Sequence, residues 1–344
     1  MLKSIFKTKR RCIYIAEIGL NHNGDISTAI QMIEAAAGAG ADAVKFQAFT
    51  PEKMNSVYTA SLLQNGSEAD PDTGIVDFFR KLTFTPAQFK KLKDKADGLG
   101  IVFFTSVFDE DSLAMTEALG VKLYKVASSE VTNHSLLKKI AATGKPVICS
   151  TGISFAKEIE SAVKILKGSG SELVLMHCVS LYPPRPEDLN LKRILSLGKR
   201  FGVEVGYSDH NREPLSCALA AACGAGIFEK HFTLSDDFDC PDKAVSLPPE
   251  RFSEMIELCE TSAAMAGDGT IDFGEAESST AVSARRSLFA ARPVKAGAVI
   301  KDDDIIALRP GIGMPEYMRG SIVGRKSSRD IKKDYLLREE YFED

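Results

Sequence analysis

The most constraining feature of the chain is an alternation, repeated eight times, between short β-branched runs and segments with the spacing of an amphipathic helix. The apolar runs lie at residues 12–19, 43–47, 101–107, 123–128, 146–152, 172–179, 203–210 and 227–234. The helical segments lie at 27–39, 86–99, 112–119, 135–143, 156–167, 191–201, 214–223 and 249–266. Eight consecutive β-then-α units predict parallel strands that close into a (β/α)₈ TIM barrel without a free sheet edge.

The alternative architecture for such a pattern is an open, doubly wound sheet. We disfavour it because no G-x-G-x-x-G sequence follows the first run. The longest insertion, at 49–83, is rich in Asn, Ser, Asp and Pro and follows the second run. We expect it to form a functional loop over the face of the barrel that carries the active site.

The alternation stops after residue 266, which divides the chain into a barrel at 1–266, a polar linker at 267–284 and a small domain at 285–344. The last part contains short alternating runs at 288–291, 305–308 and 322–324. We expect a small β-rich domain with little core of its own, packed against a barrel.

Charge and cysteine content restrict the possible partners. The net charge of −4 gives no reason to expect nucleic acid. Seven cysteines, an odd number with no C-x-x-C pair, are expected to be reduced thiols in a cytoplasmic protein. No run approaches the ~20 apolar residues of a membrane span, and the basic N-terminus lacks the apolar core of a signal peptide.

Polar side chains recur where the eight predicted strands end, and barrel enzymes carry their chemistry there. Each has an ordinary structural explanation by itself, such as a solvated charge at the rim, but their recurrence on all eight strands favours a site. Lys45 and Gln47 share one strand face. A set of cations and hydroxyls around one mouth would form an anion cradle suited to phosphate; it comprises Lys45, Lys125, Ser128, Ser150 and Ser208.

Two histidines, His210 and His231, end neighbouring strands and could share one divalent ion with water or oxygen ligands. Such a set suits Mn²⁺, Zn²⁺ or Fe²⁺, and the residues alone do not choose among them. His134 and His177 are interpreted as structural.

Several motifs in this order resemble the N-acetylneuraminate (sialic acid) synthase family over nearly the whole chain. They are IAEIGLNHNG at 15–24, VKFQ at 44–47, KVASSE at 125–130, STG at 150–152, HC at 177–178, YP at 182–183, YSDH at 207–210, EKH at 229–231 and Asp242 ahead of SL at 246–247. The tail, with RRSL at 285–288 and LRPG at 308–311, resembles the family's antifreeze-like (SAF) domain.

The resemblance implies a condensation of phosphoenolpyruvate with an open-chain N-acylmannosamine to give a nine-carbon 2-keto sugar acid and phosphate. It implies phosphoenolpyruvate contacts from Lys45, Thr105, Lys125, Ser128, Ser150, Ser180 and Ser208. It implies sugar contacts from Glu17, Gln47, Tyr182, Asp242 and Arg309. His210 and His231 would hold a divalent metal, typically Mn²⁺ with Mg²⁺ and Co²⁺ as alternatives. Proton transfer would involve Glu17 and Glu130.

The resemblance also implies a homodimer with exchanged C-terminal domains, in which Arg309 reaches the partner's barrel. Two positions depart from the family pattern: Ser180 stands where Asn is usual, and Lys243 where His is common. The second change leaves the acceptor open among N-acetylmannosamine, its 6-phosphate, and the diacetamido trideoxy hexoses that lead to legionaminic or pseudaminic acid.

Two other functions compete with this prediction. One is a Schiff-base aldolase in which Lys45 or Lys125 attacks a ketone. The other is a sugar-binding protein in which the small C-terminal domain does the binding, but it leaves the polar strand ends unexplained.

Overall fold

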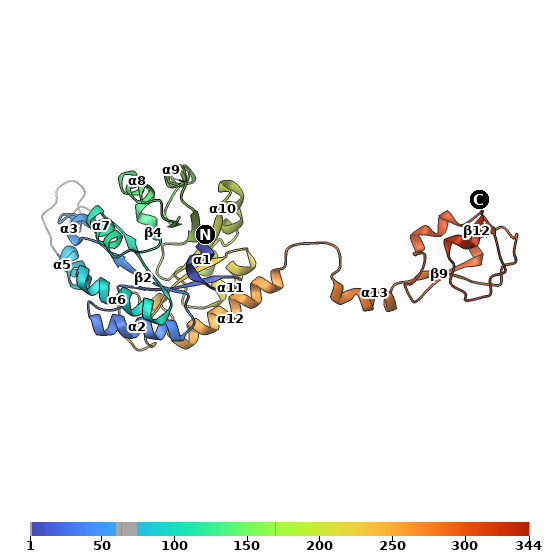
Figure 1. Cartoon of the computed structure of the whole chain (residues 1–344), viewed down its shortest axis with the longest axis horizontal. Helices are drawn as coiled ribbons and strands as arrows, with labels where there is room; N and C mark the ends of the chain where they lie inside the picture. The colour runs from blue at the N-terminus through green and yellow to red at the C-terminus, as the bar shows by residue number, and fades with distance from the viewer. Residues whose placement is uncertain (1, 60–62, 64–73, 169, 344) are drawn as a thin grey trace. The chain divides into compact units, whose positions relative to one another are not determined.

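The computed structural model describes residues 2–59, 63, 74–168 and 170–343. The chain divides into two compact units, Met1–Gly267 and Asp268–Asp344 (Figure 1).

The first unit is a closed barrel of eight parallel strands in sequential order, with β1 pairing β8, so the predicted TIM barrel is confirmed. The strands are β1 (Ile13–Gly19), β2 (Ala43–Ala48), β3 (Val102–Val107), β4 (Tyr124–Val126), β5 (Val147–Ser150), β6 (Leu173–Cys178), β7 (Glu204–Asp209) and β8 (Ile227–His231). The helices around them are α2 (Ile26–Gly38), α6 (Pro86–Leu99), α7 (Glu110–Ala118), α8 (His134–Ala142), α9 (Ala156–Lys167), α10 (Arg193–Phe201), α11 (Leu215–Ala222) and α12 (Pro249–Ala266).

Strand alternation gives the barrel two apolar layers. Outward residues such as Val44, Tyr124 and Phe228 pack with the surrounding helices into one core. Inward residues form a second, smaller cluster that fills the lower half of the barrel, and Phe6 of the N-terminal helix α1 (Leu2–Phe6) joins it. The interior of the barrel is therefore packed with apolar side chains toward the N-terminal ends of the strands, and polar side chains occupy the part toward their C-terminal ends.

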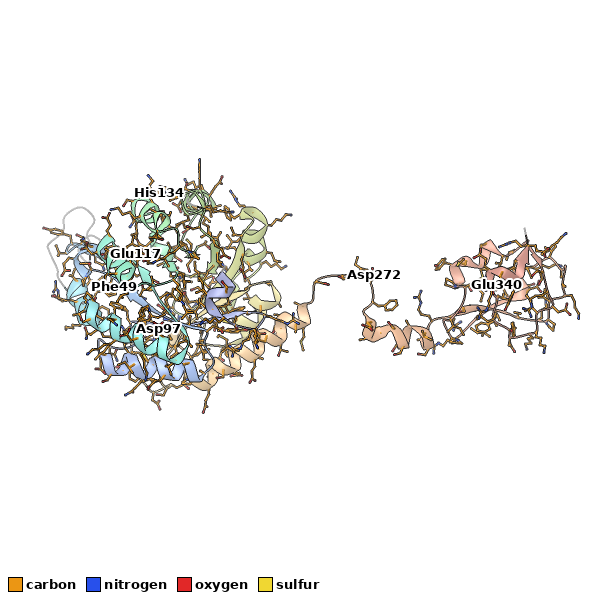
Figure 2. The ribbon with its side chains drawn as sticks, in the orientation of Figure 1. Phe49, Asp97, Glu117, His134, Asp272 and Glu340 are labelled. Carbon is orange, nitrogen blue, oxygen red and sulfur yellow. The ribbon has the colours of Figure 1, made fainter. Side chains whose placement is uncertain are left out.

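Local sequence explains the sharp helix ends. Thr85 caps α6 with a reciprocal capping box to Gln88, and Gly100 ends the helix at φ 76°, which favours glycine. His134 lies exposed at the start of α8 on the outside of the unit, away from the strand ends (Figure 2).

The insertion at 49–83 is not simply the loop that its composition predicts. Its described part contains two helices, α3 (Pro51–Met54) and α5 (Gly74–Leu82). Phe49 packs edge-on against Phe79 of α5, with ring centroids 5.5 Å apart. Packing of this kind stabilises helix α5 within a segment whose overall composition is polar. Residues 60–62 and 64–73 of the insertion lie outside the described residues.

The second unit contains α13 (Ser278–Ala284) and two antiparallel pairs, β9 (Ser287–Ala290) with β10 (Ile305–Leu308) and β11 (Lys326–Ser327) with β12 (Phe342–Glu343). Its own small core includes Leu288, Ile300 and Ile322. The predicted strand at 322–324 is wrong, because Ile322 is buried from a turn that follows a 3-10 helix (Glu316–Ser321). No helix in the described part of the chain has both the length and the apolarity to cross a bilayer.

Candidate active site

After the apolar side chains inside the barrel, the next inward position on every strand is polar or a cysteine. Glu17 follows Ile15 on β1, Lys125 follows Leu123 on β4, and the same spacing holds around the barrel. The complete ring is Glu17, Lys45, Ser106, Lys125, Ser150, Cys178, Ser208 and Glu229. The sequence thus changes from apolar to polar within each strand, at one level of the barrel.

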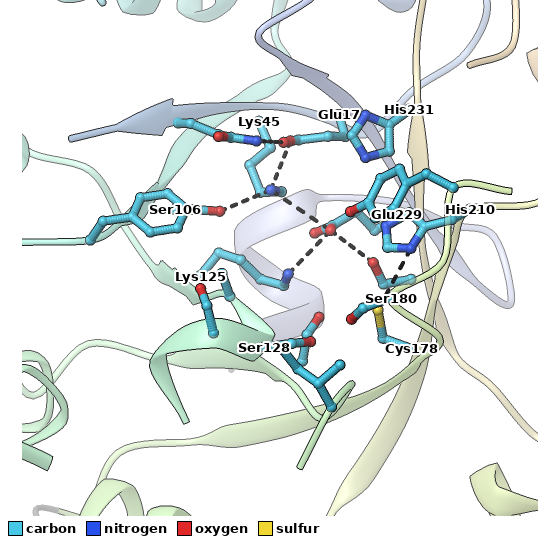
Figure 3. Close-up of a pocket in the computed structure, with 18 residues that line it drawn as sticks. Glu17, Lys45, Ser106, Lys125, Ser128, Cys178, Ser180, His210, Glu229 and His231 are labelled. Carbon is cyan, nitrogen blue, oxygen red and sulfur yellow. Dashed lines mark hydrogen bonds and ion pairs between the residues drawn. The ribbon is translucent and has the colours of Figure 1, made fainter. Parts of the chain in front are cut away.

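This ring forms the base of a cavity of about 270 Å³ at the C-terminal ends of the strands (Figure 3). Most of the predicted site residues line it: Glu17, Lys45, Gln47, Lys125, Ser128, Ser150, Ser180, Tyr182, Ser208, His210 and His231. Residues from all eight strands or the turns after them therefore meet in one place.

Two buried lysines and two buried glutamates form the centre of the cavity. Lys45 Nζ lies 2.8 Å from Glu17 Oε2 and 3.7 Å from Glu229 Oε1, and it donates to the hydroxyl of Ser106 at 2.9 Å. Lys125 Nζ and the Ser208 hydroxyl each donate to Glu229 Oε1 at 3.1 Å. Figure 3 shows both lysines pointing toward Glu229.

The charges of this cluster follow from burial and proximity. Burial alone would raise the pKa of Glu229, but Lys125 and Lys45 outweigh it and lower that pKa to about 2. Burial raises the pKa of Glu17, and Lys45 offsets part of that rise. Burial acts to lower the pKa of Lys45, yet Glu17 and Glu229 together raise it. Lys45 is therefore an ammonium at neutral pH, and the cavity contains a cation held in place by the carboxylates of Glu17 and Glu229.

Hydroxyl groups extend the cavity on the side of β4, β5 and β6. The Ser128 hydroxyl accepts from the backbone N–H of Gly152 at 2.9 Å. The buried hydroxyl of Ser150 has no hydrogen-bond partner among the described residues. A Cβ on Gly152 would lie 2.5 Å from the hydroxyl of Ser180 and 2.9 Å from that of Ser128, so glycine is needed for these groups to converge. An unpaired buried hydroxyl beside two lysines suits an anionic ligand.

The two predicted metal histidines lie together at the opposite wall, with ring centroids 5.4 Å apart. His210 Nδ1 lies 2.8 Å from the carbonyl oxygen of Val179. His231 Nδ1 lies 3.3 Å from Asp242 Oδ2, although the approach is too oblique for a good hydrogen bond. Burial acts to lower the pKa of His231, but Asp242 outweighs it and raises that pKa.

These contacts fit a shared divalent ion. Metal-binding histidines typically donate one ring N–H to a carbonyl or carboxylate and ligate through the other nitrogen. Two imidazoles on one ion, each about 2.1 Å from it, would have ring centres roughly 5 Å apart. Among the described residues no group of three or more His, Cys, Asp and Glu side chains forms a complete metal site. The ion would therefore keep positions for water and substrate oxygens.

Tyr182 lines the outer part of the cavity, and Asp242 contacts His231 from outside the lining. Tyr182 is half exposed and stacks on His210 at 4.0 Å. Asp242 is held by the buried Asn21, whose side-chain oxygen accepts from the Asp242 N–H at 2.9 Å. Asn21 also donates to the Phe232 carbonyl at 2.9 Å and to the Ser246 hydroxyl at 2.8 Å. The NHNG motif after β1 thus fixes the segment that brings Asp242 to His231.

Four predicted residues do not line the cavity, and Asp242, which contacts His231 from outside the lining, is one of them. Thr105 is buried on the outward face of β3, because alternation from the inward Phe104 places Ser106 in the cavity instead. Glu130 ends a 3-10 turn (Ser128–Glu130) that directs its carboxylate to the amide of Asn133 at 2.8 Å. Arg309 belongs to the second unit, where it is exposed just after β10.

The prediction also left two central residues without a role. Ser106 and Glu229 both line the cavity and bind the buried lysines. Strand alternation could have found both, since Ser106 lies two residues beyond an inward Phe104, and Glu229 lies two residues before His231.

A closed barrel whose mouth holds buried lysines, several hydroxyls and two neighbouring histidines has the features of an enzyme site of the TIM-barrel class. Comparison with known proteins is more specific. A model of the NeuB family matches residues 32–271, and a model of the SAF domain matches residues 285–343. The chain belongs to the NeuB family, the sialic acid synthase family predicted from its motifs, and carries a C-terminal SAF domain.

Several relatives are similar along nearly their whole length. The N,N'-diacetyllegionaminic acid synthase of Campylobacter jejuni is 33% identical over 96% of this chain and 100% of its own. A pseudaminic acid synthase of Campylobacter jejuni is 32% identical over 98% of each chain. The crystal structure of the N-acetylneuraminic acid synthetase of Leptospira borgpetersenii superposes with a TM-score of 0.72 at 34% identity, covering 78% of this chain and 90% of that one. The protein is a sugar-acid synthase-type enzyme.

Proposed function

We propose that the protein condenses phosphoenolpyruvate with an open-chain N-acylmannosamine-type sugar, in a metal-dependent reaction that yields a nine-carbon 2-keto sugar acid and phosphate. One observation carries this proposal: two buried lysines and a set of hydroxyls converge at the base of the cavity, beside a pair of histidines. The lysines and hydroxyls would bind the anionic substrate, and the neighbouring histidines would hold the metal that binds the sugar aldehyde.

Phosphoenolpyruvate would occupy the side of the cavity formed by Lys45 and Lys125 and by the hydroxyls of Ser128, Ser150, Ser180 and Ser208. Both lysines already bind Glu229, so the carboxylate keeps them in place before the substrate arrives. Pre-placed cations in a water-poor cavity stabilise charge more strongly than they would in water. Ser106 replaces Thr105 as the hydroxyl of β3 in this set.

His210 and His231 would hold the divalent ion, Mn²⁺ in the first instance with Mg²⁺ and Co²⁺ as alternatives. When bound there, the ion would supply Lewis acidity toward the aldehyde oxygen of the sugar. Gln47, Tyr182 and Asp242 would orient the sugar from the rim.

In the reaction, C3 of phosphoenolpyruvate bonds to the aldehyde carbon, water adds to C2, and the C2–O bond to phosphate breaks. The lysines hold the phosphate throughout and neutralise its charge as it leaves. Glu17 is the residue of this chain placed to move the proton of the attacking water, since burial raises its pKa toward the range useful for such transfer. Glu130 loses this role, because its carboxylate is bound to Asn133.

The Schiff-base alternative needs a neutral lysine amine, and the site disfavours it. Glu17 and Glu229 raise the pKa of Lys45, and Lys125 lies in an ion pair with Glu229 at 3.1 Å. Borohydride reduction in the presence of pyruvate would attach a three-carbon adduct to a Schiff-base lysine; we expect no adduct.

The acceptor is the finer part of the proposal. We take N-acetylmannosamine as the first acceptor, with its 6-phosphate as an alternative. The similarity to synthases of legionaminic and pseudaminic acid favours testing diacetamido trideoxy hexoses beside it. The Ser180 position, one hydroxyl in place of an amide, affects the phosphoenolpyruvate side, and Lys243 affects the sugar side.

We also propose a cytoplasmic homodimer in which Arg309 enters the partner's barrel and contacts the N-acyl group. The exposed guanidinium of Arg309 has no hydrogen bond or ion pair within the described residues, as expected for a group that acts elsewhere. Arg309→Ala should raise KM for the sugar more than KM for phosphoenolpyruvate. Mixed dimers of Arg309→Ala and His210→Ala chains, formed by co-expression, should recover activity. Inactive mixed dimers would contradict the exchange.

The direct test is phosphate release from phosphoenolpyruvate with a panel of N-acyl hexosamines, with EDTA and after Mn²⁺ is restored. We expect release that depends on one sugar, stops with EDTA and returns with Mn²⁺. No release with any sugar in the presence of metal would reject the function, and release unaffected by EDTA would reject the metal.

A further inference from the structure

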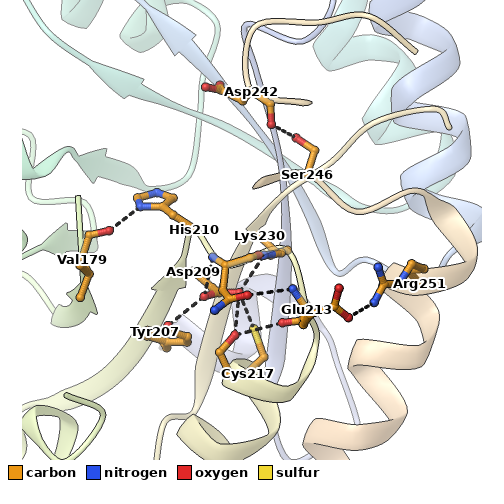
Figure 4. A network of polar contacts seen from close by, with 12 residues as sticks. Val179, Tyr207, Asp209, His210, Glu213, Cys217, Lys230, Asp242, Ser246 and Arg251 are labelled. Atoms are coloured by element: carbon orange, nitrogen blue, oxygen red, sulfur yellow. Dashed lines mark hydrogen bonds and ion pairs between the residues drawn. The ribbon is translucent and has the colours of Figure 1, made fainter. Parts of the chain in front are cut away.

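A second polar network lies behind the histidines, on the outward side of β7 and β8 (Figure 4). Asp209 and Lys230 are direct partners in the parallel register of these strands, and their pairing ends the ladder. Each is followed by one of the two histidines. Alternation directs His210 and His231 into the cavity and the two charged side chains into the helix layer. Asp209 and Lys230 are both 0% exposed.

Both carboxylate oxygens of Asp209 are hydrogen-bonded. Lys230 Nζ donates to Asp209 Oδ2 at 2.7 Å. The same carboxylate accepts from Ser216 of α11 at 3.0 Å and from the Tyr207 hydroxyl at 2.8 Å. No oxygen of Asp209 is left for a substrate, and nothing in the proposed reaction uses either residue.

The network also fixes the backbone that carries His210. Asp209 Oδ1 accepts from the Asn211 N–H at 3.1 Å, and Lys230 Nζ donates to the Asn211 carbonyl oxygen. The backbone N–H and the backbone carbonyl of Asn211 are thus both bonded to side chains of residues next to the histidines. The His210 ring is fixed separately by Val179. His210 lies just past the end of β7, where the ladder no longer holds it, so these contacts replace the missing strand pairing.

Stability alone does not account for ions at this position. Apolar residues of similar volume in place of a buried ion pair often leave a protein equally stable or more stable, whereas removing one partner is strongly destabilising. Buried pairs are better attested as devices that fix register. Here the pair aligns the ends of β7 and β8, and this alignment determines the distance between the two imidazoles.

We propose that Asp209 and Lys230 are positioning residues for the divalent ion, holding His210 and His231 at the spacing that one ion requires. The inference rests on the proposed function, because it presupposes metal binding by these histidines. It predicts that the pair determines metal affinity without contacting the metal.

The test is calorimetric titration of Mn²⁺ into the full-length protein after EDTA has been removed. Asp209→Asn, which keeps the shape of the side chain and removes its charge, should raise the Kd about 10- to 100-fold, as is typical when the groups that orient metal ligands are changed. Glu213→Gln is the matched control. This carboxylate is exposed, pairs with Arg251 and lies near the same network, so its Kd should equal that of the wild type (Figure 4).

A double variant separates positioning from stability. Asp209→Leu with Lys230→Met removes both charges together and should melt within a few degrees of the wild type, yet its Kd for Mn²⁺ should stay raised. Wild-type Mn²⁺ affinity in Asp209→Asn or in the double variant would overturn the positioning role alone. Absence of Mn²⁺ binding by the wild type would overturn both the metal site of the proposed function and this inference.

Discussion

Replacing Glu229 by Gln tests the charge cluster at the base of the cavity. Gln has the shape of a protonated Glu, so the substitution compares the ionised carboxylate with its neutral form. The pKa of Glu229 is about 2 in the folded protein against an ordinary 4.5. At ~1.4 kcal/mol per pKa unit, the ionised form stabilises the fold by roughly 3 kcal/mol at neutral pH.

The physical source of this stabilisation is the pair of lysines. Without the carboxylate, Lys125 loses its ion-pair partner at 3.1 Å, and Lys45 keeps Glu17 as its one carboxylate partner among the described residues. Because the folded pKa is lowered, the contribution is complete above pH 4.5 and is lost as pH falls toward 2. The difference between Glu229→Gln and wild type should therefore be largest at neutral pH and shrink below about pH 4.5.

Urea denaturation followed by far-UV circular dichroism suits this measurement, since the chain has no Trp. EDTA in the buffer removes any contribution from bound metal. We expect a loss of about 3 kcal/mol, which is roughly 6–12 °C in Tm for a unit of this size. Glu204→Gln, at the exposed start of β7, is the control and should leave stability unchanged. A loss below about 1 kcal/mol in Glu229→Gln would refute the assignment of the lysines to this carboxylate.

Two further predictions concern the anion side and the motif after β1. Gly152→Ala should raise KM for phosphoenolpyruvate about tenfold or more without unfolding the protein, because the new Cβ would lie 2.5 Å from the Ser180 hydroxyl. Gly38→Ala, with open space around it, is the control. An unchanged KM in steady-state kinetics of Gly152→Ala would contradict the anion cradle. His22 is buried and its pKa is lowered to about 4, so the unfolded chain takes up a proton below pH 6.5 that the folded protein refuses until about pH 4. Unfolding free energy should therefore fall by roughly 3 kcal/mol over that range, and the fall should be smaller in His22→Gln but not in His134→Gln; equal slopes for all three proteins would contradict it.

Strand and helix order could be predicted from the sequence because each barrel element has a clear period. The bounds of α6, α9 and α12 agree with the pattern residue for residue. The two-residue strands β11 and β12 could not be predicted, since a run that short has no period, and the apolar stretch at 322–324 was mistaken for one.

The candidate site was predicted where strand alternation and residue type agreed, as for Lys45, Lys125 and the two histidines. Thr105 lies outside the cavity because Phe104 faces inward, so its neighbour in the strand faces outward. Glu130 lies outside the cavity because it belongs to a 3-10 turn, in which side-chain directions do not follow strand spacing. Asp209 and Lys230 carry charge on the outward face, where only the structure shows what they bind.

Formation of the new carbon–carbon bond is followed with phosphoenolpyruvate labelled with ¹³C at C3. The protein, Mn²⁺ and the sugar that supports phosphate release are incubated together, and the products are identified by mass spectrometry and NMR. We expect one labelled nine-carbon 2-keto acid for each phosphate released, with the label at its own C3. Phosphate accompanied only by labelled pyruvate, with no new carbon–carbon bond, would contradict the proposed condensation.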